Sequence, residues 1–306
     1  MDGLPQANVH PYMSRTFTPE WEASMPTGID HGEPRIVVLD SITKLAPSHA
    51  YSVAIAASHG GVYPAMLASK ARLRGVIFSD AGVGLDAAGI GGLGLLDNAG
   101  LAAAAVDYRS ARIGDGADLY RRGIVSHVNE PAARLGCRPG DPVSYCAERM
   151  KSADPAPPPF AAVTEGRLLF HTGAPQIWGI DSNSLAEAGD AGAILVSGSH
   201  GALLGGSPES AIGPDVLAAA FNDAGLGADN AGITRLPALD RRGIIGVTVS
   251  AASARIGDAR SSWETGVISA WNATAARYGA CKGLKLHVFL MQIASRTVDD
   301  MATAEV

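Results

Sequence analysis

A long internal repeat constrains the fold of this chain of 306 residues more than any other feature. Phe78–Gly136 aligns on Phe221–Gly279 without a gap, and 27 of the 59 positions are identical. Nearer the N-terminus, Ser58-His59-Gly60 aligns on Ser199-His200-Gly201. A repeated unit of about 110 residues exceeds the length of a solenoid repeat and has the size of a small α/β domain. We therefore expect two tandem homologous units related by a pseudo-twofold axis and packed like a homodimer.

The repeat predicts four segments along the chain. We expect an N-terminal extension over residues 1–34, a first α/β unit over 35–150, a linker over 151–170 and a second α/β unit over 171–306. The linker is expected because its first part is rich in proline and alanine. The extension has no apolar run, so neither a signal peptide nor a membrane anchor is expected there.

Short apolar runs alternate with helical stretches within each unit. In the first unit we expect strands at Arg35–Leu39, Tyr51–Ala57, Gly75–Phe78, Leu101–Asp107 and Ile124–His127. We expect helices there at Val62–Leu73, Asp86–Asn98 and Asp118–Arg122. The second unit repeats the pattern, and its clearest strands are Gly192–Ser197 and Gly243–Ser250. Strands joined by helices need crossover connections, so the expected fold class is α/β with a mostly parallel sheet in each unit.

The composition narrows the classes of function. Apolar residues make up 47% and charged residues 18% of the chain, which suits a folded protein with a sizeable core. The net charge of -6 argues against a surface for nucleic acid or anionic membranes. Three cysteines without CxxC spacing make a poor disulfide framework and a poor zinc site. We expect a cytoplasmic protein with a small-molecule substrate, and Gly- and Ala-rich helices that could pack in a homo-oligomer.

Polar residues follow the apolar strands in both units. The first unit has Asp40-Ser41, Ser58-His59-Gly60, Asp80-Ala81-Gly82 and a segment from Ser110 to Asp115, and the second unit has matching segments. The carboxyl ends of parallel strands lie on one edge of a sheet, and ligands bind in the crevice there. The pattern therefore predicts that serine, histidine, aspartate and arginine side chains gather at that edge.

Six of these residues form the expected catalytic set. The two histidines are the expected general bases, because imidazole titrates near neutral pH. A serine would supply a nucleophilic hydroxyl and an aspartate would orient the histidine, as in a Ser–His–Asp arrangement. Neighbouring residues on a strand point to opposite faces, so a serine is activated more easily by a group from another strand. The set is His59, Ser58, Asp80, His200, Ser199 and Asp223.

A second group of residues is expected to bind the substrate. Arg112 and Arg255 can hold an anionic group through bidentate hydrogen bonds. The other members of this group are Asp40, Ser41, Asp115, Arg109, His127, Ser182 and Asp258. Structural roles compete with binding, because aspartates cap helices and arginines pair with aspartates. The sequence leaves open whether the two units build one shared site or two.

One stretch of the first unit resembles a known enzyme family. A strand that ends in Ser58-His59-Gly60 is followed about 20 residues later by a strand that ends in Ser79-Asp80. This layout resembles that of caspase-type cysteine peptidases over about 25 residues. The chain departs from the family where the nucleophilic cysteine would stand, because Ser79 or Asp80 occupies that place.

Taken together, the retained clusters predict an enzyme that acts on a small polar or anionic metabolite. The favoured reaction is hydrolysis of an amide or cyclic amide by serine, histidine and aspartate, with no cofactor. One alternative is a metal-dependent hydrolase or lyase in which histidines and aspartates bind a divalent ion. Another alternative is a small-molecule binding protein without catalysis.

Overall fold

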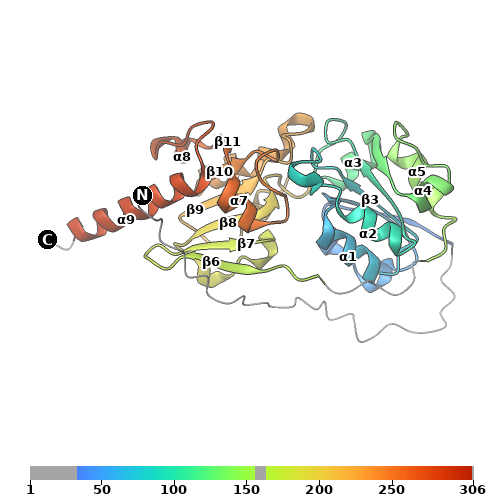
Figure 1. Ribbon diagram of the computed structural model, residues 1–306, viewed down its shortest axis with the longest axis horizontal. Helices are drawn as coiled ribbons and strands as arrows, with labels where there is room; N and C mark the ends of the chain where they lie inside the picture. The colour runs from blue at the N-terminus through green and yellow to red at the C-terminus, as the bar shows by residue number, and fades with distance from the viewer. Residues whose placement is uncertain (1–32, 156–162, 305–306) are drawn as a thin grey trace, which may run out of the picture.

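Two β-sheets, each flanked by helices, form two lobes that lie side by side (Figure 1). The computed structural model describes residues 33–155 and 163–304. Residues 33–155 form the first lobe and residues 163–304 the second. The α/β class with mostly parallel sheets is confirmed. Nearly all of the expected N-terminal extension, and the middle of the expected linker, lie outside the described residues.

The first sheet has the strand order β1-β2-β3-β4-β5. Its strands are β1 (Ile36–Leu39), β2 (Val53–His59), β3 (Gly75–Ser79), β4 (Ala102–Val106) and β5 (Val125–Val128). The first four strands are parallel, and β5 pairs with β4 in the antiparallel direction. The link from β4 to β5 stays at the carboxyl edge, where the Gly114 N–H bonds to the Ala57 carbonyl at 2.8 Å. The chain therefore enters β5 from that edge and runs back.

The second sheet has the order β11-β10-β9-β8-β7-β6. Its strands are β6 (Arg167–His171), β7 (Ile177–Ile180), β8 (Ile194–His200), β9 (Ala218–Asn222), β10 (Ile245–Val249) and β11 (Ile268–Trp271). Strands β7 to β10 are parallel, and β6 and β11 are antiparallel edge strands. Strand β6 comes from the end of the segment that the sequence predicts as a linker.

Nine α-helices accompany the sheets in the part of the chain that is described. They are α1 (Val62–Lys70), α2 (Gly92–Asn98), α3 (Gly116–Arg122), α4 (Glu130–Arg134), α5 (Val143–Met150), α6 (Arg235–Arg241), α7 (Ala259–Thr265), α8 (Ala273–Arg277) and α9 (Leu286–Ala304). Short 3-10 helices η2 (Ile42–Lys44) and η5 (Asn183–Leu185) follow β1 and β7. Helix α2 begins later than expected, because the backbone at Asp86 has a positive φ of 54°. Helix α9 projects from the second lobe (Figure 1).

The central strands are buried on both faces, which explains their continuous apolar runs. Ala54 and Ala56 of β2 pack in the cluster that contains helix α1, whereas Val53 and Ile55 pack in the cluster that contains helix α5. Alternate side chains of one strand therefore enter two different cores. The polar residues of β2 stand at its carboxyl end, which finishes at His59.

The backbone at Gly232 passes close to the carbonyl oxygen of Asp223, the residue after β9, and this contact leads to a first prediction. A Cβ added at Gly232 would lie 1.8 Å from the carbonyl oxygen of Asp223, and no side-chain movement can relieve a contact with backbone. We expect Gly232→Ala to lower the free energy of unfolding by about 2 kcal/mol or more. The control is Gly94→Ala at an exposed position of α2, where a Cβ would have no atom within 4 Å. This variant should raise the free energy of unfolding by about 0.5–1 kcal/mol. Urea unfolding measures both, and equal stabilities would contradict the prediction.

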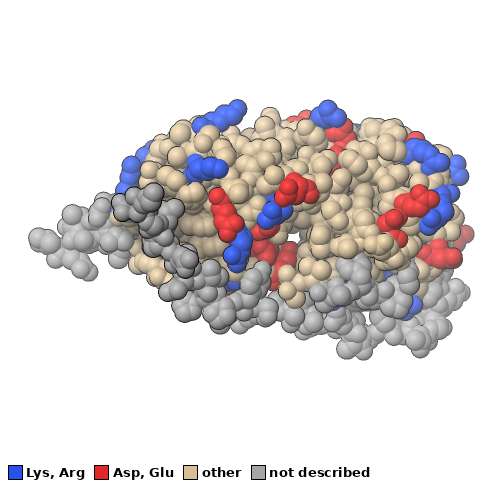
Figure 2. Space-filling view, in the orientation of Figure 1, with Lys and Arg blue, Asp and Glu red and all other residues tan. Residues whose placement is uncertain are grey.

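Charged side chains are distributed in small mixed groups over the surface. On the face shown in Figure 2, basic and acidic side chains of the described residues lie next to one another. Ion pairs among the described residues include Arg109 with Asp107 at 2.7 Å and Arg242 with Asp215 at 2.8 Å. No helix among the described residues has the length and apolar character needed to cross a membrane.

Candidate functional site

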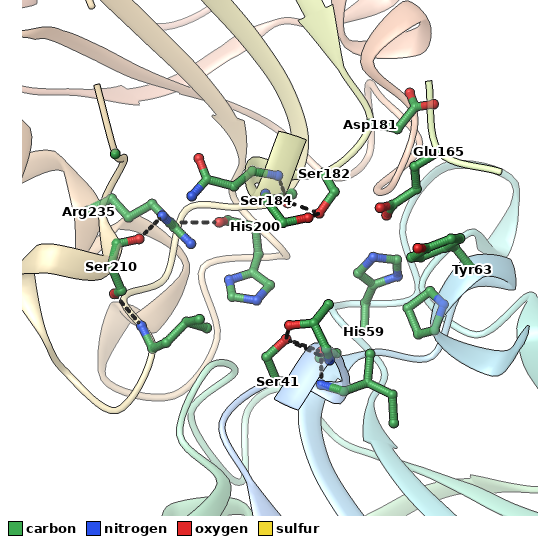
Figure 3. A pocket seen from close by; sticks show the side chains of 18 of the residues that line it. Ser41, His59, Tyr63, Glu165, Asp181, Ser182, Ser184, His200, Ser210 and Arg235 are labelled. Carbon is green, nitrogen blue, oxygen red and sulfur yellow. Dashed lines mark hydrogen bonds between the residues drawn. The ribbon is translucent and has the colours of Figure 1, made fainter. Parts of the chain in front are cut away.

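A polar pocket of about 270 Å³ lies between the two lobes (Figure 3). His59 and His200, the last residues of β2 and β8, both line it. Both Ser-His-Gly segments of the sequence therefore reach one cavity rather than two. The other polar residues that line it are Ser41, Ser58, Thr43, Tyr63, Glu165, Asp181, Ser182, Asn183, Ser184, Ser199, Glu209, Ser210 and Arg235.

Backbone groups on two sides hold the imidazole ring of His59. Its Nδ1 accepts a hydrogen bond from the Gly61 N–H at 3.2 Å. A Cβ at Gly257 would lie 3.2 Å from the ring carbon Cε1, so a glycine lets this loop of the second lobe pass close to the ring. Burial lowers the pKa of His59 to about 4. The ring is therefore neutral at pH 7, and its proton is on Nε2 because Nδ1 is an acceptor.

His200 is held in the same way, by a backbone N–H of its own lobe and a close glycine of the other lobe. Its Nδ1 accepts from the Ala202 N–H at 3.3 Å, and its Cε1 would lie 3.4 Å from a Cβ at Gly114 of the first lobe. Burial, followed by the positive charge of Arg235 and by His59, holds the pKa of His200 well below its usual value. The pocket thus contains two neutral imidazoles, each with an Nε2–H that no described group accepts.

Glu165 brings a carboxyl group with a shifted pKa to the same pocket, beside Asp181 and Tyr63 (Figure 3). Burial and the negative charge of Asp181 raise the pKa of Glu165 to about 8, against a smaller opposing effect of a hydrogen bond with Ser182. Burial and the charge of Glu165 likewise raise the pKa of Tyr63 to about 12. Glu165 therefore changes its charge near neutral pH, where a carboxyl can accept and return a proton.

The backbone around Glu165 is held in place by Asp181. The carboxylate of Asp181 accepts from the Gly166 N–H at 2.8 Å and from the Ala259 N–H at 3.0 Å. The Asp181 N–H also donates to the Gly166 carbonyl at 3.1 Å. Burial raises the pKa of Asp181, and these two N–H groups oppose the rise. Asp181 is thus a positioning residue that fixes the segment carrying Glu165 and supplies the charge beside it.

Arg235, the first residue of α6, places a guanidinium group in the pocket wall and is 2% exposed. Its Nε donates to the carbonyl of His200 at 3.2 Å, and its Nη1 donates to the carbonyls of Ser210 and Ala211. The group also lies 5.0 Å above the ring centre of Phe221. Burial lowers the pKa of Arg235 to about 9, so the guanidinium is charged at neutral pH.

The serines expected as nucleophiles line the pocket, but their hydroxyls bond to backbone N–H groups in its wall. The Oγ of Ser58 accepts from the first N–H of η2 at 3.0 Å and is 3.4 Å from the Oγ of Ser41. The Oγ of Ser199 accepts from the first N–H of η5 at 2.9 Å. Ser41 and Ser182 cap the same two 3-10 helices. None of these hydroxyls bonds to a histidine within the described residues.

The aspartates expected to orient the histidines support loops instead. The Oδ1 of Asp80 accepts from the N–H groups of Gly82 and Tyr108, each at 3.0 Å, and its Oδ2 accepts from Ser126. Asp223 accepts from two N–H groups in the same way, at 2.9 and 2.8 Å. Neither carboxylate bonds to an imidazole in the described chain, and neither lines the pocket. The structure therefore brings the two histidines together without the expected Ser–His–Asp contacts.

The two arginines expected to bind a substrate connect the lobes. Arg112 pairs with Asp229 of the second lobe at 3.5 Å, and Arg255 pairs with Asp86 of the first lobe at 3.0 Å. Neither arginine lines the pocket. Their charges are already paired with carboxylates, so we do not place them in the site.

Three expected binding aspartates hold helix N-termini. Asp115 and Asp258 cap α3 and α7, and each is also in an ion pair with the arginine three residues before it, at 2.9 Å. Asp40 accepts from the Gly116 N–H at 3.1 Å and pairs with Lys44 at 3.4 Å. The capping role that competes with binding in the sequence is the one that these carboxylates have.

Two further candidates lie outside the pocket lining. Arg109 is exposed and is bound to Asp107 by two hydrogen bonds, at 3.0 and 2.7 Å. His127 of β5 is 3.0 Å from the Oγ of Ser126 through its Nδ1. These two side chains are therefore not part of the pocket.

Sequence reasoning missed several residues that line the pocket, and Tyr63, Glu165 and Arg235 are the ionisable ones discussed above. None of them is retained in the repeat: Gly92 aligns with Arg235, and Leu204 aligns with Tyr63. Glu165 falls in the segment expected as a linker. One signal was available for Arg235, because an arginine stands where the other copy has glycine, directly before the apolar residues that begin the helix.

The described residues contain no group of three or more histidine, cysteine, aspartate or glutamate side chains arranged to hold a metal ion. The described cysteines, Cys137, Cys146 and Cys281, are free thiols. Comparisons with protein families, with curated proteins and with solved structures gave no match.

Proposed function

We propose that this chain is an enzyme that acts on a small polar molecule in the pocket between its lobes. The proposal depends on one observation: two neutral histidines, His59 and His200, line the same cavity as Glu165, whose pKa is raised to about 8. A group poised near neutral pH beside fixed hydrogen-bond donors is typical of acid–base catalysis. A volume of about 270 Å³ suits a small metabolite.

The histidines act in this proposal as donors to an oxygen atom. The Nδ1 of each ring is occupied by a backbone N–H, so each ring offers its Nε2–H to the pocket. Two fixed donors in a buried site favour the charge that develops on a carbonyl oxygen during attack. Neutral imidazole serves this role well, because it donates a proton into a hydrogen bond without transferring it.

Glu165 moves the proton. The reaction we propose is hydrolysis of an amide or cyclic amide, with water as the nucleophile. Ionised Glu165 takes a proton from water, and the water oxygen bonds to the carbonyl carbon as His59 and His200 hold the carbonyl oxygen. The C–N bond then breaks, and Glu165 returns the proton to the leaving nitrogen. The balance is one water consumed, one C–O bond formed and one C–N bond broken.

Replacing Ser58 by alanine distinguishes this mechanism from serine catalysis. We expect Ser58→Ala to retain turnover within about tenfold, because its Oγ holds a backbone N–H and no base contacts it. Ser199→Ala is the equivalent variant in the other lobe and should behave in the same way. A loss of about 10⁴-fold or more in either variant, with native circular dichroism, would establish a nucleophilic serine and overturn the proposed mechanism.

A panel of small compounds tests the proposed function itself. Linear amides, lactams and cyclic imides are incubated with the protein, and products are followed by proton NMR. The expected result is conversion of at least one class, lost when Glu165 is replaced by glutamine. Compounds that raise the melting temperature without conversion would favour a binding protein instead.

We also propose that the chain arose by internal duplication and that the lobes are related by a pseudo-twofold axis. Reciprocal contacts support this. The Leu85 N–H bonds to the Ala251 carbonyl, and the aligned Ala228 N–H bonds to the Tyr108 carbonyl, both at 2.8 Å. The ion pairs of Arg112 and Arg255 across the lobes are also at aligned positions. Such an axis would explain why one cavity receives two equivalent histidines.

A further inference from the structure

Arg235 is a buried cation without an anionic partner. It is 2% exposed, and burial alone accounts for the lowering of its pKa, with no contribution from any carboxylate. Among the described residues, none of the ion pairs includes it. Buried charges in proteins are normally paired, because an isolated buried charge is costly. An arginine that lines a pocket without a counter-ion is therefore suited to receive one from a ligand.

The donors of Arg235 show which atom is available. Its Nε and Nη1 are used by the carbonyls of His200, Ser210 and Ala211. These bonds fix the plane of the guanidinium. Its Nη2 has no partner within the described chain and is not among the fully buried atoms. One nitrogen with two N–H groups is thus left for the pocket, on a side chain that cannot turn away.

We propose that Arg235 binds a carboxylate of the substrate, so that the substrate is a small carboxylic acid that also carries the reacting amide. This inference rests on the proposed function for the position of the reacting group. In Figure 3, Arg235 lies beside Ser210 and His200 on one side of the pocket, and Glu165 and Asp181 lie on the opposite side, near His59. The carboxylate would lie near Arg235, and the amide between the histidines.

The other charges around the pocket favour a carboxylate over a phosphate. Three acidic residues line the cavity, Glu165, Asp181 and Glu209. A dianion would be repelled by these groups more strongly than a monoanion. A phosphate would also present more oxygens than the one available nitrogen of Arg235 can bind. A single carboxylate matches both the charge and the number of donors.

Calorimetric titration at pH 7 with two matched probes tests the inference. Succinamate and succinamide have the same size and differ in one carboxylate. We expect succinamate to bind about tenfold more tightly or better, and Arg235→Met to remove the difference. The control is Arg241→Met, because Arg241 is exposed at the end of the same helix, does not line the pocket and should leave both affinities unchanged.

A second variant keeps the test decisive if Arg235→Met does not fold. Asn183→Asp adds a negative charge to the pocket wall and should weaken succinamate about tenfold while sparing succinamide. Equal affinities of the two probes for the wild type, or tighter binding of inorganic phosphate than of succinamate, would overturn the inference.

The same measurements separate this inference from the proposed function. Conversion of neutral amides with no preference for acids overturns the carboxylate site and leaves the enzyme proposal standing. Tight, Arg235-dependent binding of succinamate without conversion of any compound supports the carboxylate site and overturns the enzyme proposal.

Discussion

Replacing Glu165 by glutamine is expected to lower kcat about 10²–10⁴-fold, because the variant keeps the shape of the side chain and loses the group that moves the proton. In the wild type the ionised fraction of Glu165 grows as pH rises through about 8. We therefore expect kcat/KM to rise with pH and to level off above that value. The variant should lose this rise. Steady-state rates between pH 6 and 9.5, on a substrate found with the amide panel, measure both effects.

The same substitution has an effect on stability that needs no substrate. The folded chain keeps the Glu165 proton up to about pH 8, whereas an unfolded glutamate releases it near 4.5. Between these values the folded state binds more protons than the unfolded state. The stability contributed by Glu165 is therefore fully present below pH 4.5, falls as pH rises through the window and stays constant above 8. Urea unfolding from pH 5 to 9 should show a growing advantage of Glu165→Gln over the wild type.

Glu130→Gln is the control for this stability measurement. Glu130 is exposed on α4 and pairs with Arg134 at 3.5 Å, so its removal should change stability little at any pH in the range. Parallel curves for the wild type and Glu165→Gln would mean that Glu165 ionises near its ordinary pKa. The proposed role of Glu165 would then have no basis.

The parts of the site that depend on strands could be predicted from the sequence. Apolar runs of strand length place His59 and His200 at the carboxyl ends of inner strands, and parallel pairing then brings each to the carboxyl edge of its own sheet. The retained Ser-His-Gly segments identify these ends in both copies. The α/β class follows from the same runs, since alternating strands and helices leave few other arrangements.

The partners of the charged groups could not be predicted in this way. The sequence allows Arg112 either an ion pair with a nearby aspartate or a contact with a ligand, and only the folded chain shows the ion pair with Asp115, at 2.9 Å. Asp80 follows β3, and its carboxylate accepts hydrogen bonds from two backbone N–H groups of neighbouring turns. Hydrogen bonds of this kind depend on loop conformations with positive φ, such as Ala81 at 50°, which residue type alone does not indicate.

Glu165 and Arg235 escaped prediction for a different reason. Arg235 stands in one copy of the repeat only and Glu165 lies in the segment expected as a linker, so no repeated pattern marks either residue. Their roles follow from burial, which appears only in the folded chain, where residues of both lobes line the pocket. Arg235 is charged and buried, and Glu165 has a pKa of about 8, because the fold withdraws both from water.

Substitutions of the two histidines distinguish a hydrogen-bond donor from a general base. We expect His59→Ala and His200→Ala each to lower kcat about 10²–10³-fold, the usual effect of removing one donor to a developing oxyanion. His59→Gln places an amide N–H near the position of Nε2 and should recover part of the loss. A general base would not be recovered in this way, because an amide cannot accept the proton. His127→Ala is the control, since His127 does not line the pocket.

The state of the rings can be measured directly by nitrogen-15 NMR of labelled histidines, and it decides how the rate losses are interpreted. Between pH 5 and 8 the His59 ring should remain neutral with its proton on Nε2, because burial lowers its pKa to about 4. The rate should then show no change centred near pH 6.5. A His59 ring that titrates near 6.5, together with an inactive His59→Gln variant, would assign the ring the role of a base. The proton would then move through histidine rather than through Glu165.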